Sequence, residues 1–322
     1  MSVLFEKPKH SSIISKGFTA VDMHNHSQYS DTTTKISNIA KRARKLGIGV
    51  ALTDHNEVAG NIRLSEENPD LLVIPGLEIT TKEMAHVLAY FHSHSEMQNF
   101  FDKHIKDSRG GNPYLATEVS INDLADIRSD YNCVLAPAHP FAFPKRFSFF
   151  SAMKRGNVNI DILKSFGAIE VICGANVRSM NKKAVEWSDK EQKGKIGGSD
   201  AHVLGNLGDV VTISEASDIQ NFLDAVEKKY TYVVGREARL HQRPVPMAKI
   251  ACKNLRFFRP TMKSQYELSV KAPVANAREV LKTKINPEKR EEHREQMKIG
   301  LVTLAEELNF NGYPKIKRRV KL

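Results

Sequence analysis

Short apolar runs alternate with helical patterns along the first 235 residues, and this alternation is what most limits the fold. Strand-like runs cover residues 18–23, 48–53, 71–80, 85–91, 132–140, 168–173 and 195–202, and "DVVTIS" and "YTYVV" follow them. Apolar residues recur at helical spacing between several of these runs, as in "KISNIAKRARKLG", where Gly47 is placed to end the helix. The alternation predicts an α/β protein of parallel β/α units, and six or seven such units favour a barrel.

Basic charge is concentrated after residue 235. Residues 236–322 hold 21 Lys and Arg against 9 Asp and Glu, whereas the first 235 residues hold 27 against 28. We therefore divide the chain into a nearly neutral body over 18–235 and a basic, partly helical C-terminal extension over 236–322. Charge of this kind either meets a polyanion such as nucleic acid or only solvates the extension.

The remaining bulk features favour a cytoplasmic protein without a membrane partner. No apolar run approaches the roughly 18 residues that span a bilayer, and the first residues lack the apolar stretch of a secretory signal. The three cysteines, Cys133, Cys173 and Cys252, are widely spaced, so we expect no disulfide framework. The oligomeric state has no signal in the sequence.

Side chains that bind metals follow nearly every strand-like run. They are His24, His26, Asp31, His55, Glu78, His86, His139, Asp200 and His202. Since the carboxyl ends of parallel strands face one side of a β/α fold, these residues should converge there. Imidazole and carboxylate are ligands for zinc, manganese and iron alike, so the pattern predicts a metal site without naming the metal.

A single motif of this kind carries little weight, because two histidines often fall close together by chance. The joint pattern is more specific: an HxH, a DH, a Glu, an HP and a DxH occur in this order, each at a strand end. For the other histidines we expect ordinary surface or core roles. They are His10, His92, His94, His104, His241 and His293.

Taken together, "HNHSQYSD", "LTDHN", "PGLEIT", "HVLAYF", "PAHPF" and "GGSDAH" resemble the motifs of the polymerase and histidinol phosphatase (PHP) family. The resemblance covers residues 18–235 and implies a metal-dependent phosphoesterase on a distorted seven-stranded β/α (TIM-like) barrel. It also implies two to three divalent ions (Mn, Zn or Fe). By position, His24, His26, Glu78 and Asp200 would hold one ion. Asp31, His55 and His202 would hold a second, and Glu78, His86 and His139 a third. The stretch "SDTTTK" departs from the Ser-Asp-Gly of many relatives but alters no ligand.

Hydrolysis of a phosphate ester needs a nucleophile and neutralisation of an anionic transition state. We expect a metal-bridging hydroxide to attack phosphorus, and His202 is our first choice to protonate the leaving oxygen. Asp54 precedes His55 and is a candidate to orient an imidazole, although a turn-capping role fits as well. Arg178 lies just beyond "AIEVIC" and is a candidate phosphate contact on the rim. Lys145 and Arg146 are weaker candidates, for which a solvated surface role is preferred.

Three functions of different classes fit this pattern. The first is hydrolysis of nucleotides or oligonucleotide ends, which the basic extension favours. The second is a small-molecule phosphomonoesterase of the histidinol-phosphatase type. The third is a nucleic-acid-binding accessory module with a structural metal site, which the filled set of nine ligands disfavours. An amide-hydrolysing metal enzyme is less favoured, because such barrels commonly use a metal-bridging lysine that these motifs lack.

Overall fold

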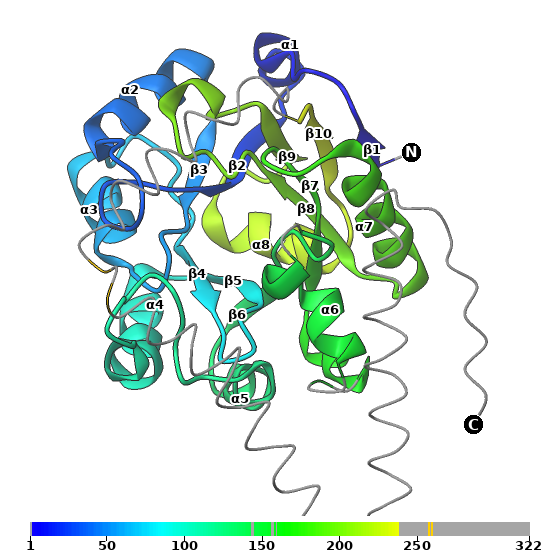
Figure 1. The fold of residues 1–322 in the computed structure, drawn as a ribbon. Helices are drawn as coiled ribbons and strands as arrows, with labels where there is room; N and C mark the ends of the chain where they lie inside the picture. Colours follow the sequence, from blue (N-terminus) through cyan, green and yellow to red (C-terminus); the bar gives the residue numbers. More distant parts are fainter. Residues whose placement is uncertain are drawn as a thin grey trace, which may run out of the picture.

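The strands of the computed structural model form three hydrogen-bonded sheets (Figure 1). The structure describes residues 2–237 except 143, 144, 156, 157 and 159, together with residues 257 and 259. The sheets have the orders β1-β10-β9-β2-β3, β4-β5-β6 and β7-β8. The strands are β1 (Val3–Leu4), β2 (Thr19–Asn25), β3 (Gly49–Leu52), β4 (Gly76–Thr80), β5 (His86–Phe91), β6 (Cys133–Pro137), β7 (Ala168–Cys173), β8 (Gly194–Gly198), β9 (Val210–Ser214) and β10 (Tyr232–Gly235).

The protein is an α/β protein as predicted, but its strands are not all parallel. β2 pairs with β3, and β7 with β8, in the predicted parallel sense. However, β4, β5 and β6 form an antiparallel meander, and β9 runs antiparallel to both β2 and β10. The prediction of uniform parallel units was therefore wrong for these strands, because an apolar run buried on both faces reads the same in either orientation.

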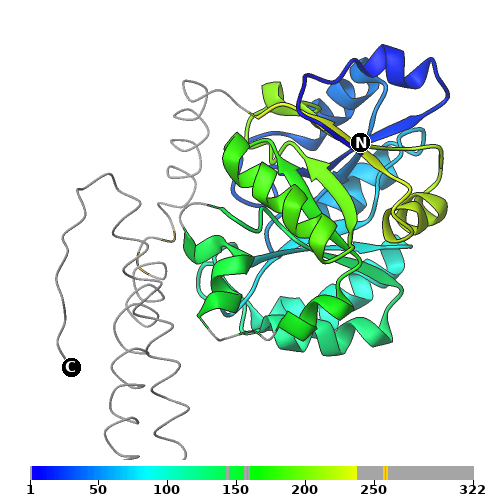
Figure 2. The same ribbon diagram turned by 90° about the vertical axis from the view of Figure 1, so that its right-hand side faces the viewer.

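The edges of the three sheets lie against one another. Two isolated β-bridges connect the first sheet to the second. One joins Val50 of β3 to Val73, before β4, and the other joins His55, after β3, to Glu78 of β4. β6 lies beside β7, and β8 lies beside β2 and β9. Figures 1 and 2 show the helices on the outside of this framework. The described residues thus enclose one apolar interior, although no continuous ladder closes the three sheets into a ring.

Five of the eight α-helices described in the body fall in segments predicted to be helical, and three do not. The helices are α1 (His10–Ile14), α2 (Ile36–Leu46), α3 (Ala59–Glu67), α4 (His94–Phe100), α5 (Ile121–Ile127), α6 (Phe149–Lys154), α7 (Arg178–Lys190) and α8 (Ile219–Glu227). α2 ends where Gly47 adopts φ +69°, as its sequence indicates. α1, α3 and α6 were not predicted. Within the described residues, no helix has both the length and the apolarity to span a membrane.

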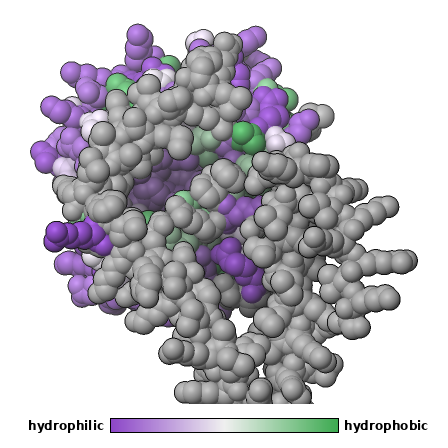
Figure 3. Space-filling view, viewed as in Figure 1, coloured by the Kyte–Doolittle hydropathy of each residue, from purple (hydrophilic) through white to green (hydrophobic). Residues whose placement is uncertain are grey.

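The body also includes residues before position 18. β1 pairs with β10, and the His10 ring nitrogen Nε2 lies 2.9 Å from the backbone oxygen of Gly208. Beyond Glu237 only residues 257 and 259 are described, so the predicted partly helical extension lies outside the described residues. On the face seen in Figure 3, hydrophilic residues line a hollow near the middle of the body.

Candidate metal centre

The structure brings all nine predicted metal-binding residues into one largely buried cluster. Within it, four overlapping groups place their ligand atoms within 4.8 Å of one another. They are His26, Asp31, His55 and His202; His24, His26 and Glu78; His24, His139 and Asp200; and His55, Glu78 and His86. The groups share residues, so the cluster is one continuous set of ligand atoms rather than several separate sites.

Glu78 lies at the centre of this lining and is fully buried in the middle of β4. Its Oε2 is 3.0 Å from Nδ1 of His55 and 3.3 Å from Nε2 of His24. Its Oε1 is 2.8 Å from Nδ1 of His86 and 3.1 Å from Nε2 of His139. One carboxylate therefore faces imidazoles from four different segments, which is the placement that a bridging ligand needs.

The antiparallel pairing of β4 with β5 explains how His86 reaches the cluster. His86 is the first residue of β5, and it pairs with Thr80 at the end of β4. In a parallel sheet the start of β5 would face the opposite side of the molecule from the end of β4. His86 therefore reaches the cluster as predicted, although the predicted direction of β5 was wrong.

Asp31 and Asp200 close the other side of the cluster. Nε2 of His202 is 3.1 Å from Oδ2 of Asp31, and Nε2 of His26 is 3.1 Å from Oδ1 of Asp200. The stacked rings of His26 and His55 lie 4.6 Å apart between these carboxylates. Negative carboxylates and imidazoles therefore alternate around the cluster.

The donor atoms fit divalent metal ions. Several buried atoms of the cluster make no hydrogen bond of good geometry, although some of them lie within 3.3 Å of a Glu78 oxygen. They are Nε2 of His24, Nδ1 of His26, His55, His86 and His139, and Oε2 of Glu78. A buried polar atom without a hydrogen bond lowers the stability of the fold by about 1–3 kcal/mol. A group of such atoms in one place therefore needs an explanation. Coordination of cations by these nitrogens and oxygens supplies one, because imidazole and carboxylate suit zinc, manganese and iron.

Charge and burial pull the pKa values in the cluster apart. Burial disfavours the charge on His202, but the carboxylate of Asp31 outweighs it and raises the pKa of His202 to about 10. Burial and the positive charge of His202 lower the pKa of His26 to about 4. Burial opposes the negative charge of Glu78, yet the surrounding imidazoles hold its pKa well below its usual range. Without metals, protons on some imidazoles thus balance the carboxylates.

Irregular backbone positions several of these side chains. The β2–β3 pairing shifts register between Asp22 and Asn25, and the β7–β8 pairing shifts between Glu170 and Ile172. His139 and Asp200 both have positive φ, at +27° and +49°. Non-glycine residues rarely adopt such angles, and bulges and strained residues gather at functional sites where they redirect side chains.

The one-residue gap between His24 and His26 lets both rings enter the cluster, with centroids 5.1 Å apart. The intervening Asn25 instead donates from Nδ2 to the backbone oxygens of Asp22 and Ala51. Its side chain thus ties the end of β2 to the neighbouring β3.

Asp54 lies beside the cluster but contacts hydroxyls rather than an imidazole. Its Oδ1 accepts from the Ser27 backbone N–H at 2.7 Å and from Ser30 Oγ at 2.5 Å, and its Oδ2 accepts from Ser27 Oγ at 2.6 Å. Burial raises the pKa of Asp54. These bonds hold the loop that carries Asp31.

Arg178 is not brought into the cluster. Its Nε is 2.7 Å from Oε1 of Glu237, and its guanidinium stacks on the ring of Phe5 at 4.6 Å. Lys145 lies in a short helical turn at Lys145–Phe147, and the side chain of Arg146 is not among the described residues. Phe147 of this turn packs against the ring of His86 at 5.1 Å.

Glu170 is the residue of the centre that the sequence did not reveal. It is buried in β7, where Oε1 accepts from Nδ1 of His24 at 2.9 Å and Oε2 accepts from the His139 backbone N–H at 2.5 Å. A carboxylate on the far nitrogen of an imidazole fixes its tautomer and leaves Nε2 free for a metal. The available signal was one Glu inside the apolar run "AIEVIC".

A family model described as PHP-associated matches residues 178–231. This segment runs from α7 to the residue before β10 and contains Asp200 and His202. Over this segment, the match bears out the resemblance to the PHP family. The match covers only part of the chain, and the comparison with curated proteins gave no match. The other motifs that resemble the PHP family lie before the matched segment, and their metal-binding side chains meet Asp200 and His202 in the cluster.

Solved structures share the fold of this chain at low sequence identity. The lesion-specific endonuclease PfuEndoQ from Pyrococcus furiosus is 16% identical with a TM-score of 0.53, over 67% of this chain and 57% of that chain. An Endonuclease Q complex with a 27-mer duplex carrying an abasic lesion is 16% identical with a TM-score of 0.50, over 68% of this chain and 60% of that chain. This chain therefore spans less than two thirds of the length of these endonucleases. A two-domain protein from Bacteroides vulgatus, containing a predicted PHP-like metal-dependent phosphoesterase, is 18% identical with a TM-score of 0.49, over 78% of this chain and 73% of that chain.

Proposed function

We propose that this protein is a metal-dependent phosphoesterase that hydrolyses phosphodiesters in nucleotides or at oligonucleotide ends, on a distorted β/α barrel. The convergence of nine imidazole and carboxylate side chains, several of whose buried atoms make no hydrogen bond of good geometry, carries the proposal. Two to three ions would be held by the overlapping groups, with Glu78 between them. When bound, such ions supply a water of lowered pKa and positive charge for the phosphate oxygens.

The protein's own residues would position the substrate and move the proton. Nε2 of His202 lies 3.1 Å from Oδ2 of Asp31, which raises the pKa of this ring, so His202 would protonate the leaving oxygen only in a state in which it binds no ion. Glu170 would keep Nε2 of His24 directed at a metal, and Asp54 would hold the Asp31 loop. Arg178 would contact a phosphate at the rim only after its ion pair with Glu237 breaks.

Two features support a nucleotide or oligonucleotide substrate. The Endonuclease Q proteins share the fold, and one of them is complexed with duplex DNA. Phe257, which belongs to the basic part of the sequence, also lies near the surroundings of the cluster, because its ring is 5.7 Å from that of Tyr114. The loop of Tyr114 is fixed beside His55, since Asn56 Nδ2 donates to the Pro113 backbone oxygen at 2.9 Å.

The proposal is tested with the full chain, a metal analysis, and a panel of phosphomonoesters, nucleotides and short labelled oligonucleotides. His24→Ala and Asp200→Ala should each lower phosphodiester turnover with Mn²⁺ by more than about 100-fold, beyond the usual cost of losing an outer partner. His104→Ala is the matched control, because His104 contacts Tyr131 outside the cluster.

Each outcome separates the candidate functions. Turnover of phosphomonoesters alone would favour the small-molecule phosphomonoesterase. Oligonucleotide binding without any turnover at full metal occupancy would favour the accessory module. Unchanged turnover in both cluster variants would refute the metal mechanism.

A further inference from the structure

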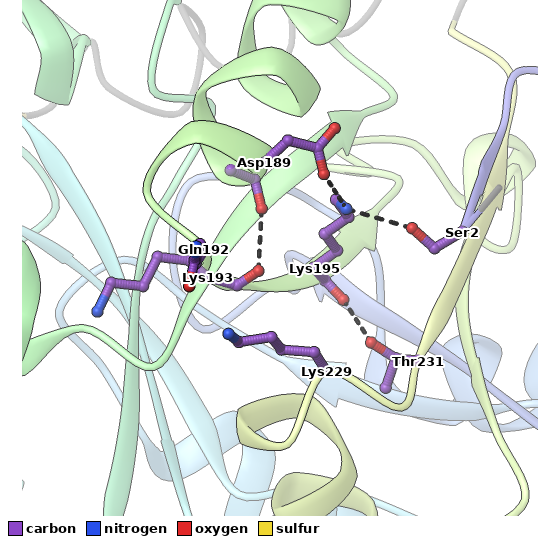
Figure 4. Close-up of a pocket in the computed structure, with 8 residues that line it drawn as sticks. Ser2, Asp189, Gln192, Lys193, Lys195, Lys229 and Thr231 are labelled. Atoms are coloured by element: carbon purple, nitrogen blue, oxygen red, sulfur yellow. Dashed lines mark hydrogen bonds and ion pairs between the residues drawn. The ribbon is translucent and has the colours of Figure 1, made fainter.

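A second polar pocket of about 220 Å³ lies at the opposite ends of the strands from the metal centre (Figure 4). Lys193 and Lys195 flank Gly194, the first residue of β8, whereas Asp200 follows the last residue of the same strand. Lys229 and Thr231, just before β10, complete the wall. The strand β8 thus separates this pocket from the nine-residue cluster.

Three lysines line the pocket, and only one of them is neutralised. Lys195 Nζ contacts Asp189 Oδ1 at 2.5 Å and donates to Ser2 Oγ at 3.2 Å. Within the described part of the chain, the ammonium groups of Lys193 and Lys229 have no ion pair or hydrogen bond. Figure 4 shows these two side chains extending toward the same side.

The surrounding charges leave the two ammonium groups uncompensated. Burial lowers the pKa of Lys193, and the charges of Lys229 and Arg128 lower it further, while Glu191 and Glu227 oppose this. Glu227 is already paired with Arg128 at 2.9 Å. Lys229 is exposed and Lys193 partly buried, and two like charges on the wall of one pocket are stabilised by an anion between them.

We propose that this pocket binds the phosphate group of a small phosphorylated molecule between Lys193 and Lys229. The pocket would be a second anion site, independent of the metal centre and of the proposed phosphoesterase function. Phosphate is favoured over a carboxylate because three oxygens can accept from both ammonium groups and from the Gln192 amide at once. A free phosphate ion and a nucleoside monophosphate share this chemistry.

The test uses lysine acylation followed by mass spectrometry on the full, metal-loaded chain. Inorganic phosphate and AMP are added separately, against sodium chloride of equal ionic strength and against adenosine. At ten times its dissociation constant, a bound phosphate should slow the labelling of Lys193 and Lys229 about tenfold. Labelling of the exposed Lys182 and Lys190 should not change. AMP acting at a lower concentration than phosphate identifies the nucleotide, and equal potency identifies the free ion.

Charge-matched variants keep the proposal separate from the proposed function. The Lys193→Gln, Lys229→Gln double variant should lose one bound phosphate per chain in calorimetry yet keep wild-type phosphodiester turnover. The Lys182→Gln, Lys190→Gln double variant should keep both properties. Equal labelling loss at all four lysines, no protection by either anion, or protection by an oligonucleotide alone would overturn the proposal. Because none of these readouts depends on turnover, an inactive metal centre leaves this test unaffected.

Discussion

Replacing Glu170 with Gln should weaken metal binding although the side chain contacts no metal. Glu170 offers two oxygens, and each accepts one buried donor: His24 Nδ1–H at 2.9 Å and the His139 N–H at 2.5 Å. A glutamine has only one acceptor oxygen, so its NH₂ group must face one of the two donors. The variant therefore loses orientation at one of two segments that enter the cluster.

The magnitude follows from the bonds that change. Turning a charge-assisted hydrogen bond into a neutral one costs about 1 kcal/mol, and a buried donor without an acceptor costs about 1–3 kcal/mol more. Losing the outer partner of a metal-binding imidazole lowers metal affinity about 10–100-fold. At about 1.4 kcal/mol per factor of ten, the loss of affinity accounts for most of that energy.

An opposing effect makes the loss depend on pH. Burial disfavours the charged form of His24, but the carboxylates, Glu170 first among them, raise its pKa well above the usual value. A metal must displace that proton, and Glu170→Gln lowers the pKa of His24 and so eases the competition. The ratio of wild-type to variant affinity should therefore grow as the pH rises from 7 to 8.5, because proton competition fades.

The assay is a titration of metal-free full chain with Zn²⁺ or Mn²⁺ against a competing chelator at both pH values. Glu227→Gln is the control, since the same chemical change there affects only the ion pair with Arg128. Equal affinities of wild type and Glu170→Gln at pH 8.5 would refute the reasoning. So would an equal loss in Glu227→Gln.

Three further predictions concern the backbone, the protons and the loop of the centre. A Cβ on Gly198 would lie 2.3 Å from the backbone nitrogen of His24, so Gly198→Ala should lower the free energy of unfolding by about 1–3 kcal/mol or more in urea titrations; Gly205→Ala, with no atom within 4 Å, should leave it unchanged. Since the pKa of His202 is raised to about 10, metal binding should release protons. The affinity for metal should therefore rise from pH 6 to 8, by up to about tenfold per pH unit for each proton displaced. Calorimetry in two buffers measures the proton release, and an affinity that does not change with pH would contradict the prediction. Asp54→Asn cannot accept all three donors from Ser27 and Ser30, so it should cost about 1–3 kcal/mol of stability and weaken Mn²⁺ binding, and a variant with wild-type values would disprove the loop-holding role.

The cluster was more predictable from the sequence than the sheets. Metal-binding residues at or after strand ends are a local pattern, and seven of the nine fit it, whereas Glu78 lies in the middle of β4 and His86 begins β5. Strand direction is not local, because it depends on which distant run supplies the partner. β4 pairs antiparallel with β5, and β5 with β6, but nothing in "PGLEIT" or "HVLAYF" indicates this direction.

The helix α3 was missed because its inward face is not apolar. Its buried residues are Gly60, Asn61 and Leu64. A Cβ on Gly60 would lie 2.5 Å from Oδ2 of Asp54, so no larger side chain fits there. Asn61 donates from Nδ2 to the backbone oxygens of Leu52 and Ile74. A helix that packs on a polar network lacks the apolar periodicity on which helix prediction depends.

Glu170 was missed for a related reason. A buried carboxylate in an apolar strand is costly unless it is paired, and its partners come from β2 and from the residues after β6. The sequence of β7 therefore indicates that Glu170 needs partners but does not show which residues they are. An isolated carboxylate inside an apolar run therefore points to hydrogen-bond donors elsewhere in the fold. In this protein those donors are the ring of His24 and the backbone of His139, so a single residue of β7 links the first and later motifs of the cluster.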